Sequence, residues 1–226
     1  SEYDKKDDEQ VRNFLKTIKG FKIIKIYERN KNFGLAENII NGVTKLINEY
    51  GKIIVLEDDL ITGKYYLEFI NDALFEYENK QDVISINGYS YLKDDSIPET
   101  YFLKTGDNLG WATWKRGWSL FEKDSQKLLE LLNQKKMTYM FNRMNSYPYT
   151  KMLEDQINGK VDSWAIRWYA SAFLNNKYTL YPKFSLVKHI GNNDGATHYN
   201  SNFPNGKDPL DIDLYNGKIN INRIDQ

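Results

Sequence analysis

The stretch Gly51–Leu60, GKIIVLEDDL, runs from an apolar segment straight into three consecutive carboxylates. Residues 53–56 predict a buried strand. Glu57, Asp58 and Asp59 follow it, at the position where open α/β sheets bind their ligands. Adjacent carboxylates repel one another, so their partial burial requires a cation or strong hydrogen-bond donors. The alternative is a solvated turn in which Glu57 or Asp58 caps the next helix.

The segments around this stretch alternate between helical and strand patterns. Helices are predicted for residues 8–21, 35–47 and 65–77, and strands for residues 23–27 and 83–86. Each strand is apolar without alternation, which indicates a mostly parallel sheet covered by helices on both faces. The first half of the chain, residues 1–88, is therefore predicted to be α/β.

The composition changes after Asn87, and all five Trp residues lie between positions 111 and 168. Helices are predicted for residues 123–133, 136–144, 149–157 and 164–174, and strands for residues 178–181 and 186–189. Asn, Gly, Asp and Pro dominate from Gly191 onward, which indicates an irregular tail. We expect residues 89–226 to form a smaller, aromatic-rich lobe within the same single domain.

Composition limits the function. The 226 residues are 41% hydrophobic, with 31 Lys plus Arg, 31 Asp plus Glu and no Cys. The balanced charge predicts no nucleic-acid partner and confines charge-dependent binding to local sites. The lack of Cys excludes disulfides and thiolate zinc sites. No apolar run approaches the ~20 residues of a membrane span, so we expect a soluble protein.

Oxygen ligands at a strand end, without Cys, favour Mg²⁺ or Mn²⁺. These ions usually complete their coordination shell with substrate phosphates. The acidic stretch therefore predicts a site for a metal ion and a phosphorylated ligand.

A series of motifs in order along the chain extends this prediction. ERNKNFGLAENIINGV precedes VLEDDL, and DNLGWATWKRGW, DSWAIRW, LYPKFSLVKHIG and GATH follow it. The series resembles the nucleotide-sugar glycosyltransferases of the GT-A fold. It is most similar to the bacterial family-2 type, with kinship to the Golgi N-acetylglucosaminyltransferase that opens hybrid N-glycan synthesis.

The resemblance implies an activity. It implies metal-dependent, inverting transfer of a hexose or N-acetylhexosamine from a nucleotide diphosphate donor, with a UDP-sugar as first choice, to a glycan or lipid-linked acceptor. We expect a cytoplasmic protein, with peripheral attachment to the inner face of the cell membrane as an alternative. A sugar nucleotidyltransferase is a second hypothesis, although the sequence lacks the Gly-rich basic loop of that class. A non-catalytic carbohydrate-binding lobe is a third.

The resemblance also assigns roles in donor binding. Asp59 would bind the metal that bridges the two phosphates, and Asp58 the ribose or a metal-bound water. Glu57 would face the nucleotide. Asn32 and Gly34 match the fold's N-x-G-x-x-x-N segment.

Asn38 completes that segment, and Gly34 would let the backbone approach the nucleotide closely. The alternative for Asn32 and Gly34 is an ordinary helix start at Leu35.

An inverting transfer needs a base for the acceptor hydroxyl. Asp162 is the first choice because it precedes Trp164, as an Asp does in the Golgi relative. There two aspartates precede the Trp, whereas here Ser163 intervenes. Asp155 is the second choice. Asp162 alternatively caps the helix together with Ser163.

Two His and two Trp complete the predicted site. His198 is expected to complete the metal shell, whereas His189 is expected to be packed or hydrogen-bonded. Trp111 and Trp114 are candidates for stacking on a sugar of the acceptor. The spacing of the other three predicts core positions: Trp118, Trp164 and Trp168.

The related fold also begins with a strand that would precede Ser1 and lie beside residues 53–56. We expect a second copy of the chain, as in a homodimer, or a rearranged segment to fill that place. Otherwise the chain is a fragment with little transferase activity.

Overall fold

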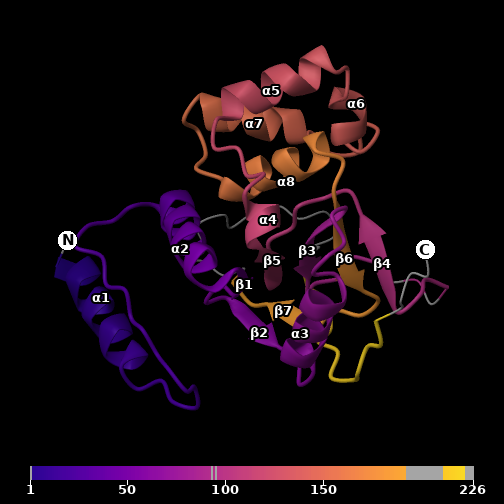
Figure 1. Ribbon diagram of the computed structural model, residues 1–226. Coiled ribbons are helices and arrows are strands. Elements are labelled where there is room, and N and C mark those ends of the chain that lie inside the picture. The colour runs from indigo at the N-terminus through magenta and orange to yellow at the C-terminus, as the bar shows by residue number, and fades with distance from the viewer. Residues whose placement is uncertain (1, 93, 95, 192–210, 222–226) are drawn as a thin grey trace. The chain divides into compact units, whose positions relative to one another are not determined.

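The computed structural model describes residues 2–92, 94, 96–191 and 211–221. The chain divides into two compact units, Ser1–Gly34 and Leu35–Gln226. Each unit is described separately below, and Figure 1 labels their elements.

The first unit contains α1 (Glu2–Leu15) followed by a segment without regular structure. Arg12 of α1 contacts the Glu28 carboxylate and donates to the carbonyl of Arg29 at 3.1 Å, which ties the helix to this segment. The prediction of a strand at residues 23–27 is wrong. A strand forms only against a partner, and none of the described strands pairs with this segment.

The second unit is built on a five-stranded sheet with the order β1-β5-β3-β6-β4. Its strands are β1 (Lys52–Val55), β3 (Val83–Asn87), β4 (Thr100–Leu103), β5 (Trp111–Trp114) and β6 (Tyr178–Pro182). A separate antiparallel pair consists of β2 (Leu60–Thr62) and β7 (Val187–His189). The helices are α2 (Leu35–Tyr50), α3 (Tyr66–Glu76), α4 (Lys115–Trp118), α5 (Ser125–Gln134), α6 (Thr138–Phe141), α7 (Tyr149–Ile157) and α8 (Trp164–Leu174).

The sheet is mixed, and the prediction of a mostly parallel sheet is wrong. Among the described strands, β3 and β6 form the one parallel pair. β5 is antiparallel to both β1 and β3 and separates them. No strand was predicted for the WATW segment, which was noted only as part of a motif that resembles the related family, yet it forms β5 in the middle of the sheet. The coarser prediction, an α/β unit with helices flanking a sheet, is confirmed.

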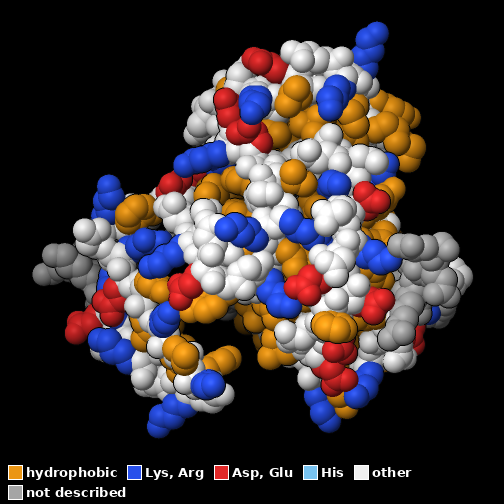
Figure 2. Space-filling view, viewed as in Figure 1, with side chains coloured by type: hydrophobic (Ala, Val, Ile, Leu, Met, Phe, Trp, Pro, Cys, Tyr) orange, Lys and Arg blue, Asp and Glu red, His pale blue; other side chains and the backbone are white. Residues whose placement is uncertain are grey.

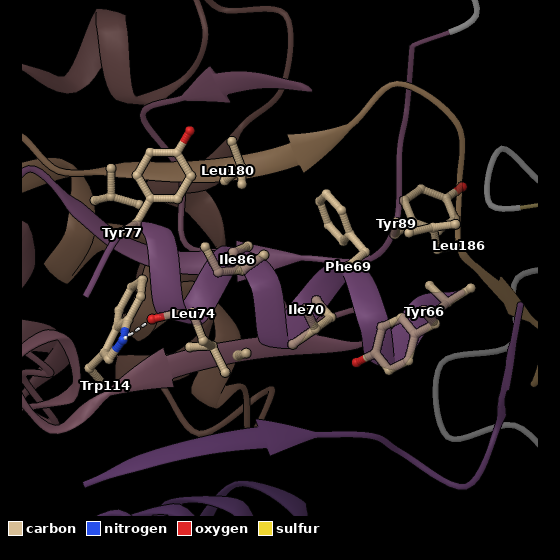
Figure 3. Close-up of a cluster of buried hydrophobic side chains, with 14 of the residues drawn as sticks. Tyr66, Phe69, Ile70, Leu74, Tyr77, Ile86, Tyr89, Trp114, Leu180 and Leu186 are labelled. Carbon is tan, nitrogen blue, oxygen red and sulfur yellow. Dashed lines mark hydrogen bonds between the residues drawn. The ribbon is translucent and has the colours of Figure 1, made fainter. Parts of the chain in front are cut away.

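One face of the sheet is covered by α3. Figure 3 shows Phe69, Ile70 and Leu74 of this helix directed at the strands, where they meet Ile86 and Leu180. The indole of Trp114 donates to the carbonyl of Leu74 at 3.1 Å. This bond fixes β5 against the helix, because a buried indole N–H needs an acceptor.

The other face is covered by α2, α4 and α8. Alternation along β5 turns Trp111 to this face and Ala112 to the α3 face. Trp111 stacks on Trp164 with ring centroids 5.3 Å apart. Two more indoles, of Trp118 and Trp168, join this cluster. The prediction that Trp118, Trp164 and Trp168 are core residues is confirmed.

Beyond α8 lies a helical lobe made of α5, α6 and α7 (Figure 1). Its small core includes Leu132, Phe141, Leu153 and Phe173. Asp124 caps α5 by accepting from the backbone of Lys127. The predicted bounds of α7 and α8 match the observed ones.

Candidate functional site

The candidate site lies at one edge of the five-stranded sheet. The register pairs Trp111 with Val55 of β1 and with Asn87 of β3, so β1 and β3 end where β5 begins. Glu57 and the two aspartates after it follow β1 directly. The topology therefore brings the acidic stretch, the end of β3 and the loop before β5 to one edge.

Asp59 is paired with a histidine. The small sheet places Leu60 opposite His189, and His189 Nε2 lies 3.2 Å from Asp59 Oδ2. The backbone of Ile190 donates to the carbonyl of Asp59 at 2.8 Å. A Cβ on Gly191 would lie 2.5 Å from Asp59 Oδ2, so only glycine leaves this carboxylate its position.

The donors of this pair fit a divalent cation. Within the described parts of the chain, no three His, Asp or Glu side chains gather closely enough to hold a metal ion by themselves. Mg²⁺ and Mn²⁺ sites, however, commonly use one or two protein ligands and take the rest from phosphates and water. Asp59 and His189 supply such a pair. His198, the predicted ligand, lies outside the described residues.

Glu57 lies in a different electrostatic setting from the exposed Asp58. Burial raises the pKa of Glu57 to about 7, and the charge of Asp59 adds to this rise, whereas a hydrogen bond from Asn108 opposes it. A carboxylate with such a pKa exchanges protons near neutral pH. Its protonation therefore responds to any charge brought to the site.

Several buried polar atoms at this edge have no hydrogen-bond partner within the described ranges. They are Glu57 Oε1, Asn87 Oδ1, His189 Nδ1, Tyr66 Oη and Trp111 Nε1. The ring of Tyr66 lies against Gly88 and Gly110, the two glycines that flank the edge. Buried polar groups in folded proteins are nearly always satisfied, so a concentration of exceptions marks a place where a ligand or water belongs.

A buried carboxylate, Asp107, stands beside this group. It accepts from the hydroxyl of Tyr181 at 3.0 Å and from the backbone of Asn108 at 2.8 Å. Burial raises the pKa of Asp107, although these bonds and one from Tyr91 act in the opposite direction. Asn108 therefore contacts both Asp107 and Glu57 and links the two carboxylates.

Asp162 precedes α8 at the same end of the sheet, because Trp164 at the start of α8 stacks on Trp111. Its side chain is exposed and lies 3.5 Å from the buried guanidinium of Arg167. Ser163 caps α8 by accepting from the backbone of Ile166. The cap is thus provided by Ser163, and the carboxylate of Asp162 remains open to solvent.

Asp155 lies in the helical lobe on α7. Its carboxylate is 2.6 Å from Lys151 and 3.5 Å from Lys160. The hydrogen bond from Lys151 is the main cause of its lowered pKa. Two ammonium partners make Asp155 a weaker base than an unpaired aspartate.

Of the predicted donor-binding residues, Asn32 and Gly34 belong to the first unit. The amide of Gly34 donates to the Asn32 side chain at 2.8 Å, and Gly34 has a φ of +75°. This turn needs glycine because other residues avoid that conformation. Asn38 is exposed on the first turn of α2 in the second unit.

Trp111 and Trp114, the predicted acceptor-binding residues, are buried on opposite faces of β5. Neither ring presents a face to solvent. Their burial explains the core on both sides of the sheet and leaves no stacking surface at these two positions.

Sequence reasoning did not place two residues at this edge. His189 was expected to be packed or hydrogen-bonded, and it does lie 3.2 Å from Asp59, but its position beside the acidic stretch was not predicted. Asp107 was named only within a motif. The signal for His189 was its place at the end of a predicted strand, which aligns it with the acidic stretch once the two short strands pair. Nothing in the sequence indicates that Asp107 is buried.

A search of known protein families finds none whose model matches this chain, and no curated protein matches it significantly. None of the described helices is long and apolar enough to cross a membrane.

Proposed function

We propose that the chain is a glycosyltransferase of the GT-A type that moves a sugar from a nucleotide diphosphate donor to a glycan or lipid-linked acceptor. The observation that carries the proposal is the pairing of Asp59 with His189 beside buried polar atoms that lack partners. The order of motifs along the sequence supports the same reading.

Asp59 and His189 would hold Mn²⁺ or Mg²⁺ together with the donor diphosphate. The bound ion would neutralise the charge that develops on the leaving nucleotide diphosphate. Glu57 Oε1 and Asn87 Oδ1 would accept hydrogen bonds from hydroxyl groups of the donor. With Nε2 of His189 directed at the metal site, its second ring nitrogen, Nδ1, would form a hydrogen bond to the donor or to water. That bond would fix the orientation of the imidazole.

Asp162 would act as the general base. Its carboxylate would take the proton of the acceptor hydroxyl while that oxygen forms a bond to the anomeric carbon. The bond from the anomeric carbon to the diphosphate oxygen breaks in the same step, and its electron pair leaves with the diphosphate. Arg167 would orient Asp162 through their ion pair.

Calorimetric titration with UDP, with Mn²⁺ and then with EDTA, tests the donor site. We expect metal-dependent binding that Asp59→Asn abolishes and His189→Gln weakens at least tenfold. Gly191→Ala should weaken binding as well, because its Cβ displaces the Asp59 carboxylate while both ligands remain present.

Asp82→Asn, at an exposed aspartate on another part of the unit, is the matched control and should bind normally. Binding of UDP that is identical in EDTA and in Mn²⁺ would refute the metal site. If UDP binding depends on the metal but no nucleotide sugar releases UDP, the metal site is supported and the proposed sugar transfer is refuted. A panel of nucleotide sugars then identifies the donor.

A further inference from the structure

The far end of the helical lobe exposes large apolar side chains. Tyr139 and Met140 of α6 are 54% and 56% exposed, and Met144 and Tyr147 of the following loop are 64% and 49% exposed. These four residues are called the lobe tip below. Figure 2 shows hydrophobic side chains gathered over the end of the lobe that carries α6, with Lys and Arg side chains beside them.

The lobe tip is held by a well-bonded backbone. Phe141, the inward residue of α6, is buried in the core of the lobe. The amide of Met144 donates to the carbonyl of Tyr139 at 2.9 Å. The side chain of Asn142 bonds both the amide and the hydroxyl of Thr150 at 2.9 Å and closes the loop.

The loop backbone is also strained. Arg143, Met144 and Asn145 have φ values of 48°, 55° and 62°, three consecutive non-glycine residues in the left-handed region. Such conformations cost free energy and persist where the surrounding structure determines them, often at functional positions. This geometry presents Met144 outward, although an inward methionine would gain burial energy.

Charge around the lobe tip has one sign. The sequence has no acidic residue between Glu130 and Glu154, while it has four basic ones, at Lys135, Lys136, Arg143 and Lys151. Lys151 pairs with Asp155 on α7, and the Arg143 guanidinium lies over the ring of Tyr149. Lys135 and Lys136 are exposed, and none of the described carboxylates forms an ion pair with either.

We propose that the lobe tip docks on the surface of an anionic lipid bilayer. Tyrosine rings are enriched at the membrane–water boundary, where their apolar body and polar hydroxyl are both satisfied. Methionine adds flexible apolar contact, and adjacent lysines are attracted to anionic headgroups. A protein partner would instead have to offer acidic groups to Lys135 and Lys136.

Co-sedimentation of the whole chain with vesicles tests the proposal. We expect binding to vesicles that contain phosphatidylglycerol, weak binding to pure phosphatidylcholine, and loss of binding at high salt. Lys135→Gln/Lys136→Gln should weaken binding about thirtyfold, as expected when two interfacial charges are lost. Met140→Ser/Met144→Ser should weaken it about tenfold.

Each variant has a matched control elsewhere in the same unit. Lys80→Gln/Lys115→Gln changes the net charge equally, and Phe75→Ser removes an apolar side chain that is exposed on α3. Both controls should bind as the parent does, and circular dichroism verifies that each variant is folded. The proposal concerns this surface alone and does not depend on transferase activity.

Three results would overturn it. The first is no vesicle binding at low salt. The second is binding that the lobe-tip variants and the controls reduce equally, or that is the same for neutral and anionic vesicles. The third is self-association in sedimentation equilibrium that Met140→Ser/Met144→Ser abolishes, which would make the lobe tip a contact between two copies of the chain.

Discussion

The sheet edge and the lobe tip depart from the usual burial of side chains in opposite ways. At the sheet edge, polar atoms of Glu57, Asn87 and His189 are buried without partners within the described chain. At the lobe tip, Met144 and its apolar neighbours are exposed, although the backbone that carries them is held by hydrogen bonds. A buried polar atom without a partner is stabilised by a hydrogen bond or an ion, whereas an exposed apolar side chain is stabilised by contact with another apolar surface. The two regions therefore need different kinds of contact.

The two regions therefore suit ligands of different chemistry. The sheet edge offers carboxylates and a histidine, which suit cations and hydroxyl groups. The lobe tip offers lysines and apolar surface, which suit anionic headgroups. The balanced charge of the whole chain conceals this division, because positive and negative groups cancel in the total while they segregate in space.

The largest effect is expected from Trp111→Ala. Trp111 is fully buried behind the sheet edge and contacts three other tryptophans. Its truncation should lower the free energy of unfolding by about 3–5 kcal/mol. Tyr139→Ala at the lobe tip, also an aromatic truncation, should cost less than about 0.5 kcal/mol. Urea unfolding measures the free energy of unfolding of both variants. Equal losses would show that the two aromatic side chains are equally important for stability and would contradict the contrast.

Asp162→Asn should lower transferase turnover about a hundredfold, equivalent to about 2.7 kcal/mol in the barrier, without weakening UDP binding. Asp155→Asn is the control in the helical lobe, since Lys151 and Lys160 hold that carboxylate. Steady-state kinetics with the identified donor measures both. A normal Asp162→Asn and an inactive Asp155→Asn would move the base to Asp155.

Glu57 predicts a pH dependence of stability. Its pKa is about 7 in the folded chain against an ordinary value of 4.5, so the folded state binds more protons between these limits. The free energy of unfolding should therefore fall as the pH rises through this window, by about 1–2 kcal/mol since the side chain is partly exposed.

Glu57→Gln should remove that part of the pH dependence and leave the variant more stable than the parent above neutral pH. Urea unfolding at about pH 5 and pH 8 in EDTA tests the sign. The burial of Glu57 would be contradicted if the free energy of unfolding of the parent chain rose from about pH 5 to about pH 8 and Glu57→Gln showed the same pH dependence as the parent.

The smallest effect belongs to Met140→Ser/Met144→Ser. Both side chains are exposed, so their replacement should shift the melting temperature by no more than about 2 °C. Calorimetry checks this value. A loss of more than about 5 °C would mean that the two methionines pack within the lobe, and the contrast with the sheet edge would weaken.

The sequence predicted the parts of the fold that depend on local periodicity. The bounds of α7 and α8 follow from helical spacing, and β1 from an apolar run. No strand was predicted at β5, and its antiparallel pairing with β1 and β3 could not be predicted either, because strand pairing is decided by contacts between distant segments. Residues 23–27 have strand-like composition, but composition supplies no pairing partner.

In the candidate site, too, the sequence placed residues by local order but did not reveal partners that are distant along the chain. Asp59 was placed at a strand end by sequence order alone. Its partner His189 is 130 positions away, and only the pairing of β2 with β7 brings them together. Whether Asp107 is buried depends on Tyr181, also distant in sequence, so no local pattern indicates it.

The position of β5 also sets the order in which the sheet can be completed. Among the described strands, β1 pairs only with β5, which lies more than fifty positions later in the sequence, and β3 lies between them along the chain. During synthesis, the strand that leads into the acidic stretch therefore has no neighbour until Trp114 has emerged. We expect β1 to be protected from hydrogen exchange late in refolding, after the helices, because long loops close slowly.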